Sequence, residues 1–167
     1  MTTTKPPKFV TIGVYGTTKE SFFAALQKAN VDTFCDIRQR RGVRGSLYTY
    51  ANSQSLQDNL AELGIRYLHR KDLAPSKATR EIQYAKDAES KTGKRNRSQL
   101  SDEYIQAYRQ ECLDDFNPQS LLDELPDDAK VVALFCVEKD AEACHRSLVA
   151  EKLHSEIGAE IAHLHTC

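Results

Sequence analysis

The sequence predicts a single α/β domain spanning residues 1–167, with a mainly parallel, open five-stranded sheet and flanking helices. Its 167 residues and 18.8 kDa suit one domain. Short β-branched and aromatic segments alternate with segments of helical spacing. The first strand, helix and second strand follow one another within about thirty residues, a spacing that favours a crossover between parallel strands.

The N-terminal part has the pattern of a βαβ unit. Residues Phe9–Tyr15 are rich in β-branched and aromatic side chains and predict the first strand. Thr17 and Glu20 match a capping box, so a helix is predicted to begin there. Residues Val31–Ile37 predict the second strand.

Another helix and strand are predicted to follow. The helix begins at Ser53 or Ser55 and ends at Gly64. Residues Ile65–Leu68 predict the third strand.

The middle of the chain, approximately residues 71–117, has no strand pattern and predicts a helical insertion or lid between strands three and four. Helical patterns cover Arg80–Glu89 and Ser101–Phe116. The polar stretch Ser90–Ser98 between them is expected to be mobile.

The C-terminal part completes the alternating pattern. Residues Val131–Cys136 are apolar on both faces, as in a buried parallel strand. A helix is predicted from about Ala141 to Ile157, with Asp140 as its N-cap. A closing strand is predicted at Glu160–Leu164.

Composition excludes several classes of protein. With 40% hydrophobic and 28% charged residues, the chain is neither disordered nor collagen-like. No apolar run is long enough to span a membrane. The first eight residues lack the apolar core of a signal peptide, and five cysteines are an odd number for disulfides. We therefore expect a cytoplasmic protein with no membrane association.

Charge is segregated along the chain although the net charge is only −1. Between Arg38 and Arg97 there are fourteen Lys and Arg against six Asp and Glu, whereas Asp102 to Asp128 holds one basic residue against nine acidic. This pattern indicates one region suited to anions. A general nucleic-acid coating would be expected to give a positive total.

The first candidate site follows the second strand, because ligands of wound α/β sheets bind beyond the carboxyl ends of the strands. Asp36 and Arg38 are two residues apart and share a face of the strand. Arg40, Arg41 and Arg44 follow within a glycine-containing loop. Forked guanidinium groups here predict binding of phosphate or carboxylate.

The second candidate site follows the fourth strand. Glu138 lies just beyond its end, where a carboxylate can act as a base or orient an arginine. Arg146 continues the apolar stripe of the last helix, so we expect it to reach the pocket and pair with Glu138, Asp36 or a ligand. His145 lies at the margin of that stripe and is a candidate proton carrier.

The cysteines here allow two interpretations. Cys136 ends a buried strand and is interpreted as a small hydrophobic residue. Cys144 is a candidate nucleophile, but it points away from the site if the helix begins at Asp140; a later helix start would turn it inward. No metal site is expected, because no Cys-x2-Cys pair is present. A zinc set, meaning a group of possible zinc ligands, could be drawn from five residues but is not expected to bind the metal: Cys144, His145, His163, His165 and Cys167.

Taken together, these motifs resemble the domain of unknown function family 488. The resemblance rests on four stretches of the sequence: Thr11-Ile12-Gly13, Asp36-Ile37-Arg38, Ile65-Arg66-Tyr67, and Cys136-x-Glu138 followed by Cys144-His145-Arg146. It implies an α/β fold and a shared polar site, without an established activity. The chain departs from the family pattern at Val14-Tyr15, at Arg40-Arg41-Gly42 and at Leu73-Ala74-Pro75.

The leading functional hypothesis is an enzyme that binds an anionic, phosphate-bearing ligand, either a nucleotide or a nucleic-acid segment. The predicted ligand-binding residues are Arg38, Arg146, Arg40, Arg41, Arg44 and Tyr67. The predicted catalytic residues are Glu138, His145, Asp36 and Cys144. No cofactor motif is present, and no cofactor is expected.

Two other classes of function remain open. One is a non-catalytic nucleic-acid-binding module with its basic stretch along the backbone. The other is a thiol or metal sensor that uses Cys136 and Cys144.

Overall fold

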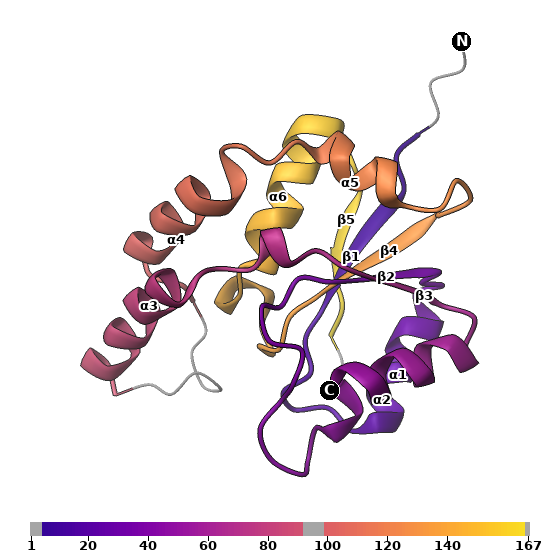
Figure 1. The fold of residues 1–167 in the computed structure, drawn as a ribbon, viewed down its shortest axis with the longest axis horizontal. Helices are drawn as coiled ribbons and strands as arrows, with labels where there is room; N and C mark the ends of the chain where they lie inside the picture. Colours follow the sequence, from indigo (N-terminus) through magenta and orange to yellow (C-terminus); the bar gives the residue numbers. More distant parts are fainter. Residues whose placement is uncertain (1–4, 92–98, 166–167) are drawn as a thin grey trace.

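The sheet is five-stranded and entirely parallel, which confirms the predicted fold class (Figure 1). The computed structural model describes residues 5–91 and 99–165. Its strands are β1 (Lys8–Ile12), β2 (Thr33–Asp36), β3 (Arg66–His69), β4 (Val131–Phe135) and β5 (Ile161–His163). Their order across the sheet is β3-β2-β4-β1-β5, so β4 is central.

The register brings the ends of the central strands to one level. Phe135 at the end of β4 pairs with Ile12 of β1 and Asp36 of β2. Asp36 in turn pairs with His69 of β3. The segments that follow β1, β2 and β4 therefore begin side by side at one edge of the sheet.

Helices cover both faces of the sheet, as its apolar strands require (Figure 1). Helices α1 (Lys19–Lys28) and α2 (Ser53–Glu62) lie on one face, and α5 (Pro118–Glu124) and α6 (Arg146–Ile157) on the other. The core under α1 is aromatic, since Phe22 packs against both Phe34 and Phe135.

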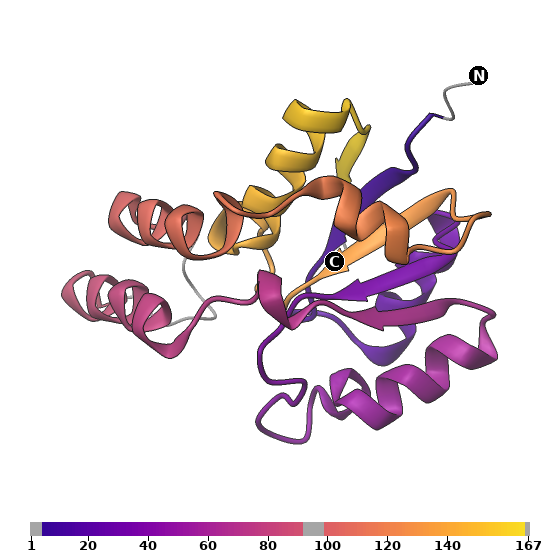
Figure 2. The ribbon, with the colours of Figure 1, turned by 45° about the horizontal axis from the view of Figure 1, so that its top comes forward.

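The predicted insertion between β3 and β4 is present. Helices α3 (Lys77–Glu89) and α4 (Asp102–Tyr108) lie side by side and project away from the sheet (Figure 2). Helix α4 continues into a π-helical segment, Arg109–Leu113. Most of the polar stretch predicted to be mobile, residues 92–98, lies outside the described residues.

Two local details differ from the prediction. The N-cap of α1 is Thr18, which forms a capping box with Ser21, because the Thr17 hydroxyl is already bonded to the Val14 carbonyl. Strand β1 ends at Ile12 instead of Tyr15, because Tyr15 and Val14 both donate to one carbonyl in the turn after β4. Among the described helices, none has the length and apolar character needed to cross a membrane.

Candidate active site at the carboxyl edge of the sheet

The segment between β4 and α6 does not form the continuous helix that was predicted. Residues Ala141–Ala143 form a single 3-10 turn, and the side chain of Asp140 makes no capping bond. Cys144 is extended, with φ −141° and ψ 147°, and α6 begins only at Arg146. This later start turns the Cys144 side chain inward, and the residue is only 1% exposed. Asp140 as the N-cap of the long helix was therefore wrong.

Arg146 holds this segment in place. It points inward as predicted and is 1% exposed. Its Nη1 donates to the Glu138 carbonyl at 2.6 Å and its Nη2 to the Lys139 carbonyl at 3.1 Å. The hydrogen-bond acceptors of Arg146 in these two contacts are thus backbone carbonyl oxygens. A Cβ atom at Gly13 would lie 1.8 Å from the same Glu138 oxygen, so only glycine fits beside this contact.

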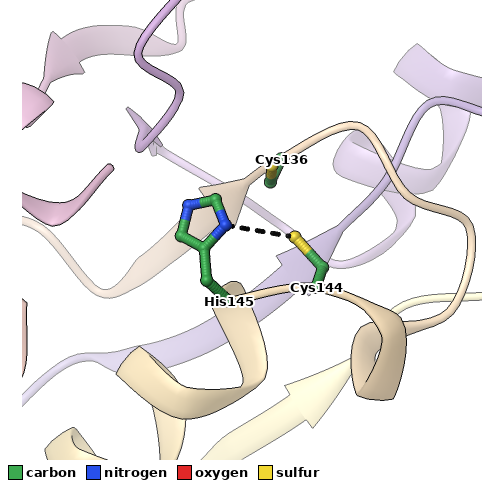
Figure 3. Close-up of side chains that lie close together, drawn as sticks. All are labelled: Cys136, Cys144 and His145. Atoms are coloured by element: carbon green, nitrogen blue, oxygen red, sulfur yellow. Dashed lines mark hydrogen bonds between the residues drawn. The ribbon is translucent and has the colours of Figure 1, made fainter. Parts of the chain in front are cut away.

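His145 links α6 to the end of β2. Its Nε2 lies 2.9 Å from the Ile37 carbonyl oxygen. Because a carbonyl only accepts, Nε2 must carry a proton. The other ring nitrogen, Nδ1, faces the Cys144 sulfur at 3.7 Å (Figure 3). Cys144 and His145 therefore form a thiol–imidazole pair whose orientation is fixed by the main chain of β2.

Electrostatics favour the charged form of this pair. Burial raises the pKa of the Cys144 thiol, but a hydrogen bond from Cys136, the charge and hydrogen bond of His145 and the charge of Arg146 outweigh it and bring the pKa well below its usual 9.0. Burial lowers the pKa of His145, and the Cys144 thiolate more than reverses this. The arrangement is that of a thiolate–imidazolium pair.

Two other buried cysteines provide a contrast. Burial raises the pKa of Cys35 well above its usual value, and it raises the pKa of Cys112 to about 12. Among the residues that the structure describes, no histidine lowers the pKa of either thiol. Cys144 is therefore the thiol with the most thiolate character among these three.

Cys136 and Glu138 extend the pair into a cluster. The Cys136 sulfur lies 3.5 Å from the Glu138 carboxylate, so its single S–H can be given either to this carboxylate or to Cys144. One ligand atom each from Cys136, Cys144 and His145 lie within 4.8 Å of one another (Figure 3). Sequence reasoning treated Cys136 as a small hydrophobic residue. Only the sensor hypothesis gave Cys136 a role, and its contact with Cys144 and His145 was not predicted, because it crosses an irregular loop.

Asp36 and Arg38 form a buried ion pair beside this cluster. Arg38 donates to Asp36 through Nε at 2.9 Å and Nη2 at 2.8 Å, and its guanidinium lies 4.7 Å from the centre of the Phe135 ring. Arg38 is 4% exposed, and its Nη1 has no hydrogen-bond partner in the described parts of the chain. Both N–H groups on this nitrogen are thus unsatisfied, which is costly unless a ligand or water accepts them.

The ion pair is connected to the protein surface through Tyr67. The Tyr67 hydroxyl donates to Asp36 at 2.7 Å. Burial, followed by the charge of Asp36, raises the pKa of Tyr67 to about 12. A hydrogen bond to Tyr67 raises the pKa of the exposed Arg41. Arg40 and Arg44 are exposed on the same loop.

The helical insertion covers the thiol–imidazole pair. The ring of Tyr108, at the end of α4, lies 5.3 Å from the His145 ring, and its hydroxyl donates to the Leu73 carbonyl at 2.6 Å. Tyr108 is fully buried. Sequence reasoning missed this residue, because nothing in the local pattern distinguishes a core tyrosine of a helix from one that covers a site.

The remaining residues of the zinc set are elsewhere. His163 on β5 lies 2.7 Å from the Thr11 hydroxyl, and Cys167 is outside the described residues. A cavity of about 950 Å³ lies between α6, β5 and the π-helical segment, and it is lined by residues such as Arg109, Leu148 and Ile161. Of the zinc set, His163 lines this cavity, but none of the predicted catalytic or ligand-binding residues does, so we place the site where the reactive groups gather.

Comparison with known families places the chain in one of them. The family model described as "Domain of unknown function DUF488" matches residues 18–153. The chain belongs to this family. The match contains Asp36, Arg38, Glu138 and the segment 144–146. No curated protein and no solved structure matches the DUF488 chain.

Proposed function

We propose that this protein is an enzyme that binds an anionic, phosphate-bearing ligand at the carboxyl edge of the sheet and attacks it with the Cys144 thiolate. The supporting observation is the 2.9 Å contact between His145 and the Ile37 carbonyl. It joins the thiol–imidazole pair to the residue that immediately precedes Arg38. A nucleophile and a basic anion-binding segment then adjoin one another.

Each residue has a role that follows from its contacts. His145 accepts the proton of Cys144, the thiolate displaces the leaving group from the bound ligand, and His145 gives that leaving group the proton. Water then hydrolyses the covalent intermediate and frees Cys144. The free Nη1 of Arg38 binds the anionic group, which supplies an acceptor that its N–H groups lack. Arg146 is a positioning residue, because its hydrogen bonds go to the carbonyls that shape the loop.

The exposed and acidic residues assist. Arg40, Arg41 and Arg44 attract the ligand from solvent, where their charges act at longer range. Asp36 orients Arg38 and Tyr67, and Glu138 lies beside Cys136, which neighbours the reacting thiol of Cys144. The ligand is a nucleotide or a segment of nucleic acid. A reducing compartment such as the cytosol would keep Cys144 free.

Ligand binding is tested by a thermal-shift screen of nucleotides and phosphorylated metabolites. Wild type is compared with the double variant Arg41→Gln, Arg44→Gln and with Arg66→Gln. Arg66 is a matched control, because it is an exposed arginine at the start of β3, away from the carboxyl edge. A true ligand raises the Tm of wild type and Arg66→Gln by several degrees but stabilises the double variant less. Equal stabilisation of all three proteins refutes the proposed anion site.

Catalysis is tested separately with the ligand that the screen identifies. Cys144→Ser should retain the thermal shift and lose turnover, because the hydroxyl is a far weaker nucleophile than the thiolate. Intact-protein mass spectrometry of wild type should detect a covalent adduct that is absent from Cys144→Ser. Turnover by Cys144→Ser at the wild-type rate would remove Cys144 from the mechanism.

A second function, a non-catalytic nucleic-acid-binding module, is favoured by the exposure of Arg40, Arg41 and Arg44 on one loop. Binding would then weaken steeply with salt, because counterions are released from the phosphates. Substitution of Cys144 would have no effect on such binding. Salt-dependent binding of oligonucleotides without any turnover would favour this function over the enzyme.

A further inference from the structure

We propose that Cys136, Cys144 and His145 also form a binding site for one Zn²⁺ ion, and that the metal and the nucleophilic role of Cys144 exclude each other. The metal site follows from the contacts of these three side chains alone. Only the second half of the proposal, the exclusion, rests on the proposed function.

The distances fit the geometry of zinc. Zinc binds sulfur at about 2.3 Å and imidazole nitrogen at about 2.0–2.1 Å, usually as a tetrahedron. Neighbouring sulfur and nitrogen ligands of such an ion are therefore about 3.5–3.7 Å apart. The Cys144 sulfur and His145 Nδ1 are 3.7 Å apart, and all three ligand atoms fall within 4.8 Å of one another. Small side-chain rotations suffice to bring the two sulfurs and the nitrogen to bonding distance from one ion.

The outer contact of His145 is the one that metal-binding histidines make. A ligating imidazole almost always donates its second N–H to a carboxylate, carbonyl or water. In this protein Nε2 donates to the Ile37 carbonyl at 2.9 Å, which leaves Nδ1 available on the side of the two sulfurs. The tautomer that zinc needs is thus already selected.

The donor atoms also select the class of metal. Two sulfurs and one imidazole suit zinc and disfavour Mg²⁺ and Ca²⁺, which prefer oxygen. Binding displaces a proton from each cysteine that is still a thiol, and the two thiolates neutralise the charge of the ion. The Glu138 carboxylate, which lies 3.5 Å from the Cys136 sulfur, or a water molecule takes the fourth position.

Metal binding regulates the enzyme if the proposed function is correct. A sulfur lone pair that is donated to zinc cannot attack a substrate, and a metal-bound Nδ1 cannot accept a proton. Zn²⁺ therefore holds the enzyme inactive, and removal of the metal restores the thiol–imidazole pair.

The direct test is titration of chelator-treated protein with Co²⁺ followed by Zn²⁺. We expect thiolate-to-cobalt charge-transfer absorbance that saturates at one equivalent and disappears when Zn²⁺ displaces Co²⁺. The site variants are Cys136→Ser, Cys144→Ser and His145→Ala. Cys112→Ser is the matched control, because Cys112 is also a buried free cysteine but lies in the insertion. Each site variant should weaken Co²⁺ binding at least about tenfold, and the control should bind as wild type does.

Either of two results would overturn the metal site. In the first, wild type with Co²⁺ has no charge-transfer absorbance. In the second, folded Cys136→Ser binds Co²⁺ as tightly as wild type does. Thermal melts establish that each variant is folded. If a variant does not fold, X-ray absorption of zinc-loaded wild type tests the site instead. Fewer than two sulfur ligands around the zinc would contradict the proposed ligand set.

Cys136→Ser also separates this proposal from the proposed function. With the ligand found in the thermal-shift screen, inhibition of this variant by Zn²⁺, relative to its own turnover without metal, should require at least about tenfold more Zn²⁺ than inhibition of wild type. Absence of turnover in every protein would refute the enzyme while leaving the cobalt titration intact. Inhibition of Cys136→Ser at the wild-type Zn²⁺ concentration would refute the metal site.

Discussion

The imidazole of His145 is bonded to the carbonyl oxygen of Ile37 at 2.9 Å, across 108 positions of the sequence. The bond connects the start of α6 to the end of β2, two elements that reach the same edge of the sheet. It fixes which nitrogen of His145 carries a proton and which faces Cys144. The geometry of the reactive pair is therefore set by the sheet as well as by its own loop.

Replacing Gly13 should disrupt the loop that presents Cys144. In Gly13→Ala the new methyl group would lie 1.8 Å from the Glu138 carbonyl oxygen, which accepts from Arg146 at 2.6 Å. The backbone must shift, at a cost of about 1–3 kcal/mol or more in the free energy of unfolding. Urea denaturation measures this loss.

Gly42→Ala is the matched control for that substitution. A Cβ atom at Gly42 would lie 3.8 Å from Asn52, which is ordinary van der Waals contact. We expect a change within about 0.5 kcal/mol, as for most surface substitutions. Equal stability of Gly13→Ala and Gly42→Ala would contradict the close approach of the two loops.

Removing the ring of Tyr108 should expose the reactive pair. In Tyr108→Ala the ring that covers His145 is lost, and we expect a cost of about 3–5 kcal/mol in stability together with faster alkylation of Cys144. Tyr108→Phe keeps the ring and loses only the bond to the Leu73 carbonyl, at a cost of about 1 kcal/mol. Peptide mapping by mass spectrometry after brief exposure to iodoacetamide measures the alkylation.

An alkylation rate at Cys144 that is the same in Tyr108→Phe and in folded Tyr108→Ala would show that Tyr108 does not cover the site. Alkylation of Cys35, which lies in β2 and is fully buried, reports whether the variant has lost its core.

Acid should weaken the contact that Glu111 makes within the insertion, between the π-helical segment and the start of α3. Its carboxylate accepts from the hydroxyls of Ser76 at 2.7 Å and Thr79 at 2.6 Å. Burial raises the pKa of Glu111, but these bonds outweigh it and lower the pKa below the usual 4.5. A lowered folded-state pKa stabilises the protein above the unfolded-state pKa, and this stabilisation is lost as pH falls through the folded-state value.

Melting curves of wild type and Glu111→Gln across pH test this linkage. Wild type should have the higher Tm at neutral pH, and the difference should shrink between about pH 5 and pH 3. A Tm difference that stays constant down to pH 3 would contradict the role of the Glu111 charge.

The sequence pattern predicts the strands and the layered fold, because buried parallel strands and amphipathic helices have strong local patterns. It also predicts that Arg146 points inward, since helical spacing continues from Val149 and Leu153. Strand order was out of reach, because it depends on contacts between distant segments. The central position of β4 has no local pattern of its own.

The prediction failed where local geometry is irregular. Asp140 is a good N-cap by residue type, yet the chain makes one 3-10 turn and an extended residue before α6 begins. That difference decides whether Cys144 faces solvent or His145. The contact of Cys136 with His145 and the position of Tyr108 over the site were not predicted for a related reason: each depends on how separate segments come together.

The most direct test of the account is the ionisation of Cys144 in metal-free protein. Thiolate absorbs in the ultraviolet, so the difference in absorbance between wild type and Cys144→Ser across pH reports this one thiol without a reagent that must reach it. Because His145 and Arg146 lower the pKa of Cys144, we predict a thiolate difference well below pH 9.0 that moves upward in His145→Gln. A difference that emerges only at or above pH 9.0 would contradict the thiolate–imidazolium pair.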